Sequence, residues 1–267
     1  MKTKLSLTLL TAACLLTSLP ASTLAAEFLQ AEITRVSNDV KVLKANAAPK
    51  AAAVGLKLDP VSSIATGPDA RAELRFPDKT LTRLGANSRF TLKGQSRTLD
   101  LNEGTMMLQV PKNQGGAKVR TAGVTAALTG TTVLIEYHAG GIIKFIVIEG
   151  ESALFLNKTT DVSQILKAGQ MITMRDGDVT IPPPQDVDLA KLLKSSKLIS
   201  LNDPSQPNQR QISDAFNVQE RMIKDGDLVN GNFYIPEMGL SIGINNNTRT
   251  NIINQPEVCR EPKPSQR

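Results

Sequence analysis

Side chains that could do chemistry are few in this sequence of 267 residues. His138 is the single histidine, and the two cysteines are Cys14 and Cys259. A zinc finger, an iron–sulfur cluster or a disulfide scaffold needs more ligands than these. A Ser-His-Asp or Cys-His site would have to use His138, which no activated-nucleophile motif accompanies. Because His138 stands just before a Gly-Gly pair, we expect it on an exposed turn.

Two acids around a glycine, Asp176 and Asp178, resemble the start of a calcium loop. The further acids and the distal glutamate of such a loop are missing, and Asp-Gly is typical of a hairpin turn. The sequence contains neither a G-x-x-x-x-G-K phosphate loop nor a nucleophile elbow. We therefore expect no enzyme, no cofactor and no metal site. Aromatic residues make up only 3% and basic residues are scattered, which argues against nucleic-acid binding.

Period-two alternation between residues 32 and 181 predicts the elements that would carry a site. Residues 70–76 (ARAELRF) alternate small or apolar with charged side chains, as a strand with one buried face does. Residues 142–148 (IIKFIVI) are almost wholly apolar, which indicates a central strand covered on both faces. Residues 102–104 (NEG) are expected to form a turn between two further strands. This spacing predicts an all-β sandwich, barrel or solenoid-like domain of antiparallel-type strands.

Two short helices are predicted after this region. The prolines at residues 182–184 are expected to end the sheet, because proline removes ladder donors. Asp186 can cap a helix with leucines on one face and lysines on the other. Such a basic helix can lie on a membrane, although packing on its own domain is more common. The second helix is predicted over residues 213–224, with Ser213 as its cap and Gly226 just after its end.

The N-terminus has the pattern of a secretory signal. Two lysines precede an uncharged apolar run over residues 5–19, and small residues follow it. The run is shorter than the roughly 20 residues of a spanning helix, which favours a cleavable signal at residues 1–25 over a membrane anchor. A lipoprotein signal at Cys14 is disfavoured, because this cysteine falls inside the apolar run. Cleavage would leave Cys259 as a lone cysteine and lower the formal net charge from +6 to +4.

These signals divide the chain into five predicted parts. They are a cleavable signal peptide (1–25), a β domain (26–181), a proline linker (182–185), short helices (186–225) and a tail rich in Asn and Pro (226–267). The tail can bury little apolar surface and is expected to be largely disordered. We expect an exported protein in the periplasm or outside the cell, with no stable membrane insertion after cleavage.

Seven motifs in a fixed order resemble the FecR-type periplasmic domain over residues 64–156. They are IATGPDARAEL (64–74), FPDKT (76–80), LGANS (84–88), LDLNEG (99–104), TAGVTAALTGT (121–131), VIEG (147–150) and LKAGQ (166–170). The motif positions, all expected to be structural, are Gly67, Asp78, Ser88, Gly104, Gly130, Thr131, Gly150 and Gly169. Two positions depart from the pattern. Lys79 replaces a turn glycine, so we expect a turn that keeps φ negative there, and Ala122 replaces the usual proline.

The resemblance implies a solenoid-like or sandwich β domain that binds a protein in the cell envelope and has no catalytic residues. Transducers of this family place an anti-sigma segment and a membrane helix before the domain, whereas a signal peptide is expected here. We therefore expect an exported, non-catalytic binding module without those two parts. Its partner would be another envelope protein, held for example at an edge strand. Binding of envelope glycan or lipopolysaccharide through Arg71, Arg75 and Arg83 is the alternative.

Overall fold

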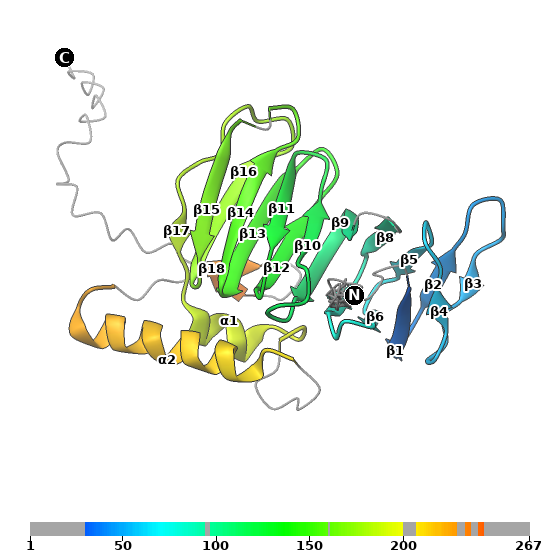
Figure 1. Cartoon of the computed structure of the whole chain (residues 1–267), viewed down its shortest axis with the longest axis horizontal. Helices are drawn as coiled ribbons and strands as arrows, with labels where there is room; N and C mark the ends of the chain where they lie inside the picture. Colours follow the sequence, from blue (N-terminus) through cyan, green and yellow to red (C-terminus); the bar gives the residue numbers. More distant parts are fainter. Residues whose placement is uncertain are drawn as a thin grey trace, which may run out of the picture.

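Residues 31–186 fold into two stacked β-sheets that share one long strand (Figure 1). The computed structural model describes residues 30–93, 97–159, 161–199, 207–228, 233–235 and 240–242. The predicted signal peptide, both cysteines and most of the predicted tail lie outside these residues. Within the tail, β18 (Phe233–Ile235) and β19 (Leu240–Ile242) form an antiparallel pair.

We call the two layers the covered sheet and the open sheet, because the helices pack on only one of them. In spatial order, the covered sheet contains β4 (Lys57–Leu58), β1 (Ala31–Ser37), β6 (Arg71–Arg75), β7 (Leu81–Leu84), the second half of β9 (Thr98–Gln109), β12 (Thr132–Tyr137), β13 (Ile142–Glu149), β16 (Gln170–Arg175) and β17 (Gln185–Asp186). The open sheet contains β3 (Lys50–Ala51), β2 (Val40–Leu43), β5 (Ser63–Thr66), β8 (Arg89–Lys93), the first half of β9, β10 (Ala117–Arg120), β11 (Val124–Leu128), β14 (Glu151–Leu156) and β15 (Ser163–Lys167). Among the described strands, only β9 and β10 pair in parallel. The predicted all-β domain followed by short helices is confirmed.

Strand β9 passes from the open sheet into the covered sheet at Gly104. The backbone of Gly104 has a φ of 92°, and the pairing with β8 shifts register between Arg89 and Phe90. A Cβ atom at this position would lie 2.3 Å from Ser88 Oγ, so a side chain is excluded there. The predicted turn at residues 102–104 is therefore wrong. The Asn-Glu-Gly sequence makes a bend inside one strand, because strands on both sides continue the hydrogen bonding.

The main apolar core fills the space between the two sheets. Strand β13 contributes to it on one side with Phe145 and Val147, while Ile146 and Ile148 point the other way toward the helices. The predicted central strand with two covered faces is thus confirmed. Leucine, isoleucine, valine and alanine supply most of this core, as a sequence without tryptophan requires.

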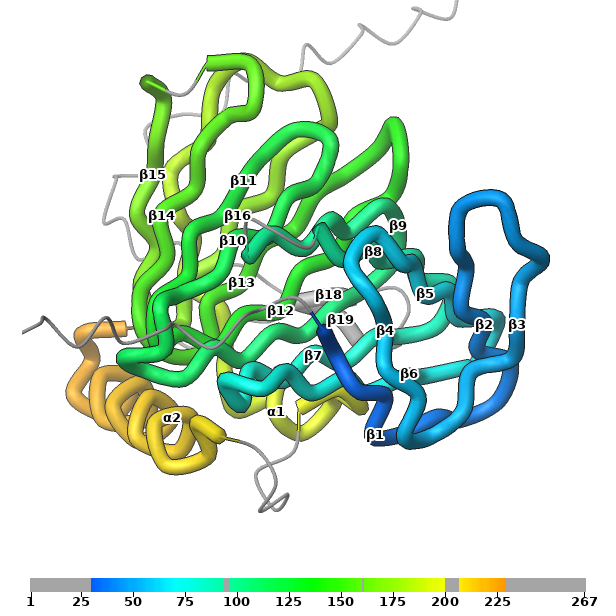
Figure 2. The backbone as a smooth tube through the Cα atoms, turned by 45° about the vertical axis from the view of Figure 1, so that its right-hand side comes forward, coloured from blue at the N-terminus to red at the C-terminus, as the bar shows by residue number. Residues whose placement is uncertain are grey.

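Two helices cover the outer face of the covered sheet (Figures 1 and 2). Helix α1 (Leu189–Ser195) is capped by Asp188, whose side chain accepts a hydrogen bond from the Lys191 amide, and Asp186 lies in β17 instead. Helix α2 (Gln209–Asp225) has Asn208 and not Ser213 as its N-cap residue, while Gly226 after its end has the predicted left-handed backbone. The prolines do not end the sheet, because β17 follows them.

Lys79 has a φ of 69°, so the expectation that this turn keeps φ negative is wrong. The turn is closed by a hydrogen bond from Phe76 N to Thr80 O of 2.9 Å and by one from Lys79 N to Phe76 O of 2.9 Å. Asp78 Oδ1 also accepts a 2.9 Å hydrogen bond from Thr80 N. These bonds hold a lysine in a conformation that a glycine would adopt without strain.

Replacing Lys79 with glycine should therefore stabilise the domain. We expect Lys79→Gly to raise the free energy of unfolding by about 0.5–1 kcal/mol, since the relief of left-handed strain exceeds the entropy cost of a glycine. Thermal denaturation should show a Tm higher by about 1–4 °C. Lys79→Ala is the control, because alanine carries the same strain. Equal Tm values for the glycine and alanine variants would contradict this account.

Candidate functional site

The family motif positions lie at bends and turns of the two sheets. Next to the bend at Gly104, Ser88 Oγ accepts a 2.9 Å hydrogen bond from Thr105 N and so pins β9 as it changes sheet. At the turn after β13, Gly150 has a φ of 82°, and a Cβ there would lie 2.7 Å from Gly130 O. Thr131 Oγ1 donates a 2.8 Å hydrogen bond to Glu151 O beside it. These residues support the backbone.

Gly67 and Gly169 are packing positions. The Gly67 amide donates to Asp39 O at 2.8 Å, and an added Cβ would lie 3.3 Å from Asp39 Oδ2. An added Cβ at Gly169 would lie 2.7 Å from Gln219 Nε2, so this glycine leaves room for helix α2. The structure therefore spreads the motif positions along the sandwich and does not gather them into one pocket.

Asp78 is the one motif position that belongs to a buried ion pair. Its carboxylate lies against the Arg97 guanidinium, and Arg97 Nε also donates to Gly116 O. The pair ties the turn before β7 to the loops before β9 and β10. Sequence reasoning missed Arg97, because nothing in its local pattern reveals a partner 19 residues away.

Two buried amide side chains fix helix α2 to the covered sheet and to the start of α1. Asn208 Nδ2 donates to Val110 O at 3.2 Å and to Glu149 Oε2 at 3.1 Å. Gln219 Oε1 accepts from Leu189 N at 2.8 Å, and its Nε2 donates to Val187 O at 2.6 Å. These bonds cross between distant segments, so they set where the helix lies.

Glu149 is a buried carboxyl under the start of α2. Desolvation raises the pKa of Glu149, while hydrogen bonds from Thr132 and Asn208 and the charge of Lys112 oppose this rise. Ionisation of this group at neutral pH therefore works against the folded state.

The residues that the sequence analysis considered for catalysis or metal binding make local contacts. His138 follows the end of β12 with a side chain 46% exposed, and its Nε2 lies 3.1 Å from Glu136 Oε1. Asp176 Oδ2 accepts from Tyr137 Oη at 3.0 Å, and Asp178 Oδ2 accepts from Arg175 N at 2.7 Å in the turn after β16. Within the described part of the chain, no three metal-binding side chains come together.

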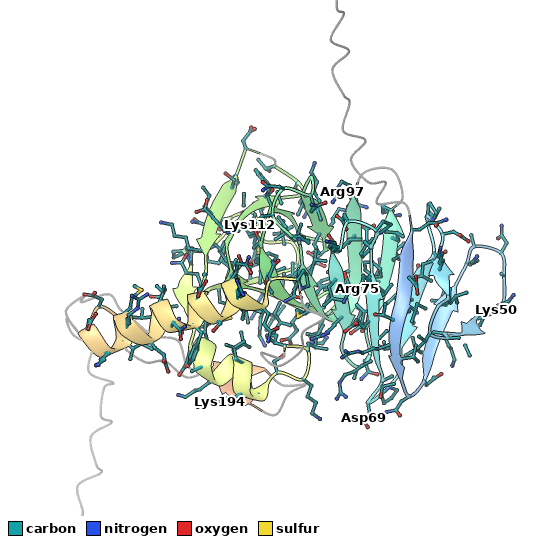
Figure 3. The ribbon with its side chains drawn as sticks, turned by 60° about the horizontal axis from the view of Figure 1, so that its bottom comes forward. Lys50, Asp69, Arg75, Arg97, Lys112 and Lys194 are labelled. Atoms are coloured by element: carbon teal, nitrogen blue, oxygen red, sulfur yellow. The ribbon has the colours of Figure 1, made fainter. Side chains whose placement is uncertain are left out.

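Basic side chains are spread over the molecule. Lys194 lies on α1, whereas Lys50 lies on β3 at the other end of the sandwich (Figure 3). Of the arginines in the glycan hypothesis, Arg83 is buried, and its Nε donates to Glu73 Oε2 at 2.8 Å. Arg71 and Arg75 flank Glu73 on β6. These three arginines therefore do not form one exposed anion site.

The outer face of the open sheet holds the best candidate for a functional site. Neither helix contributes to it, and among the described residues no element packs over β10, β11 and β14. The strand register places Arg120 opposite Thr125 and Thr125 opposite Phe155. In the next row, Lys118 lies opposite Ala127. Buried and more exposed side chains alternate along β10, β11 and β14, but the register that joins the rows does not follow from such alternation.

These side chains line an open groove with a volume of about 680 Å³. We call it the sheet groove, and its walls include Lys118, Arg120, Ala127, Phe155 and Asn157. Two cations and no carboxylate belong to this lining, although Asp100 lies just outside it, where its oxygens accept from Arg120 at 3.0 and 2.8 Å. The groove therefore combines an apolar floor with positive charge.

Most polar atoms of the sheet groove are already bonded within the protein. Asn157 Nδ2 donates to Thr121 O at 2.8 Å and to Ala122 O at 2.9 Å, and its Oδ1 accepts from Thr125 Oγ1 at 2.6 Å. Lys118 makes no ion pair or side-chain hydrogen bond with any other described residue. Its ammonium is therefore the group in the groove that has charge to offer a ligand.

The edge strand β15 is partly closed to strand addition. On the side facing away from β14, Lys167 N donates to Gln170 Oε1 at 2.9 Å, and Ile165 O accepts from Gln164 Nε2 at 3.1 Å. Side chains thus occupy main-chain groups that a partner strand would need. The structure favours the face of the open sheet over this edge as a binding surface.

Part of the β domain matches a known protein family. The family model described as FecR protein matches residues 62–153, close to the predicted core of 64–156. Two crystal structures of a proposed anti-sigma factor from Parabacteroides distasonis ATCC 8503 are similar to this chain. The first has a TM-score of 0.42 and 17% identity over 49% of this chain, and the match spans 62% of its own length. The second has a TM-score of 0.40 and 11% identity over 68% of this chain and 97% of its own. The search of curated proteins found no match to this sequence.

The buried carboxyl predicts a pH dependence of stability. Because the pKa of Glu149 is raised in the folded state, its ionisation lowers stability as the pH rises from the ordinary glutamate pKa through the folded one. Glu149→Gln keeps an oxygen for Thr132 and Asn208 but cannot ionise. In urea unfolding, this variant should gain on wild type between pH 4 and pH 8. The exposed neighbour variant Glu151→Gln is the control, and a pH-independent difference for Glu149→Gln would refute the role of burial.

Removing the side-chain hydrogen bonds of Gln164 and Gln170 at the β15 edge should lead to self-association of the protein. We expect the double variant Gln164→Ala, Gln170→Ala to form dimers or larger species, because it exposes the strand edge. Light scattering coupled to gel filtration measures this at several concentrations. Gln211→Ala on α2 is the control. A double variant with the same mass distribution as wild type would show that the glutamines do not protect the edge.

Proposed function

Because residues 62–153 form a FecR domain, we propose that this protein is an exported, non-catalytic protein-binding module of the cell envelope. Domains of this family are typically non-catalytic signalling modules. The observation that carries the proposal is the difference between the two outer faces. Helices cover one sheet, while the other presents the sheet groove without a cover among the described residues. An uncovered face with apolar floor and charged rim is what a binding surface requires.

Location in the periplasm or outside the cell is part of this proposal. It rests on the order of basic, apolar and small residues at positions 1–25. None of the helices in the described ranges is long and apolar enough to cross a membrane. The proposed partner is another protein of the envelope, bound at the open sheet.

Binding of envelope glycan or lipopolysaccharide is the alternative, and it has less support. Of the three arginines expected to bind anions, Arg83 is buried against Glu73. The sheet groove offers few unbonded hydroxyl or amide groups for a sugar, since Asn157 uses its amide within the protein.

Site-specific photocrosslinking in cells tests the proposed function. A photoreactive phenylalanine analogue at Ile165, which is 52% exposed on the open sheet, should give discrete adducts with one or a few envelope proteins. The same analogue at Glu220, exposed on α2, should give none of these adducts. A charge in the apolar run, Leu10→Arg, should block export and abolish the adducts. Identical adduct patterns from both positions, or none from Ile165, would refute the proposal.

A further inference from the structure

The sheet groove has a chemistry that selects among partners, and the inference drawn from it rests on the proposed function. We infer that the groove binds an acidic segment of the partner, with a carboxylate on Lys118 and an apolar side chain against Phe155 and Ala127. Lys118 is exposed and makes no ion pair with a described residue. Arg120, held by Asp100, extends the positive rim beside it.

Charge complementarity supports a carboxylate ligand. The lining of the groove contains lysine and arginine but no acid. Of the acids on the strands around the groove, Asp100 binds Arg120, and Glu151 lies opposite Lys167 in the strand register. A negative group at Lys118 would therefore meet an unopposed positive charge.

The bonding state of the polar atoms favours a peptide over a sugar. A glycan presents many hydroxyl groups, and these need free donors and acceptors on the protein. Thr125 Oγ1 already donates a hydrogen bond to Asn157 Oδ1, and two nitrogens of Arg120 donate to the Asp100 carboxylate. What the groove has to offer is one cation and an apolar floor, which fits a carboxylate and a nearby aliphatic side chain.

The shape of the groove also argues against a lipid chain. Its floor is the outer surface of β11 and β14, and the groove is open to solvent. An acyl chain lying there would keep much of its surface in water. A peptide side chain is short enough to be covered by Phe155 and the neighbouring strand.

The register sets a spacing for the ligand. Strand β11 lies between β10, which carries Lys118, and β14, which carries Phe155. The residue of β10 in register with Phe155 is Arg120, so Lys118 is offset from Phe155 by two residues along the strand. Strand spacing and rise put their Cα atoms about 12 Å apart. An extended segment covers this distance in about three to four residues. The acid and the apolar residue should therefore be separated by that interval.

Selection from a phage-displayed library of random dodecapeptides tests the inference, with the full chain after signal cleavage as bait. Wild-type bait should enrich peptides with Asp or Glu three or four residues from Leu, Ile, Val or Phe. Lys118→Glu should lose these peptides and reduce the binding of the best one at least tenfold. Phe155→Leu should weaken it less, and Lys194→Glu on α1 is the matched charge control, expected to bind as wild type. Circular dichroism should show unchanged folding of the exposed-site variants.

The remaining outcomes separate this inference from the proposed function. Enriched peptides without acids, or the same peptides on Lys118→Glu bait, would overturn the acidic partner, while adducts from Ile165 would still support protein binding. Vesicles containing lipopolysaccharide form a second arm. If they bind wild type but not Lys118→Glu, and no acidic peptide is enriched, the groove takes an anionic lipid and the inference is wrong. Peptide binding should also fall as salt is raised from 50 to 500 mM, because the contact to Lys118 is exposed.

Discussion

The passage of one strand through both sheets is the constraint on which the rest of the structure depends. Strand β9 pairs with β8 and β10 in the open sheet and with β7 and β12 in the covered sheet. Its bend needs a glycine at position 104 and the hydroxyl of Ser88 against it. Because the layers are joined at this point, their inner faces must stack, and each layer keeps a single outer face for helices or for a partner.

The position of the helices determines which outer face of the sandwich stays exposed for binding. Asn208 and Gln219 bond to main-chain groups of the covered sheet and of the segment leading into α1, so α2 has a defined position and not only an apolar contact. Burying Glu149 at this junction has an electrostatic cost, which the hydrogen bond from Asn208 partly offsets. The open sheet has no such anchors among the described residues, and its outer face carries exposed charged side chains such as Lys118 and Arg120.

Sequence patterns predicted the fold class because alternation along a strand reflects its two environments, as in β13. These patterns failed where one local sequence is compatible with several backbone conformations. Residues 102–104 resemble a turn but form a bend within β9, and Lys79 adopts a glycine-like φ because Asp78 and Thr80 close the turn. The sheet groove was not predicted, since its side chains come from three strands whose register is set by the whole sandwich and not by any one segment.

Carboxylates inside the molecule are used to hold the fold together, and this explains the character of the exposed face. Asp78 binds Arg97, Glu73 binds Arg83, and Glu149 accepts from Asn208. Each acid thus makes a contact between two different elements, where loss of one partner would leave an unpaired buried charge. Because Asp100 beside the sheet groove is likewise paired with Arg120, it does not neutralise Lys118, whose ammonium has no ion-pair partner among the described residues. The same pairing that stabilises the sandwich therefore gives its open face a positive, apolar surface suited to an acidic partner.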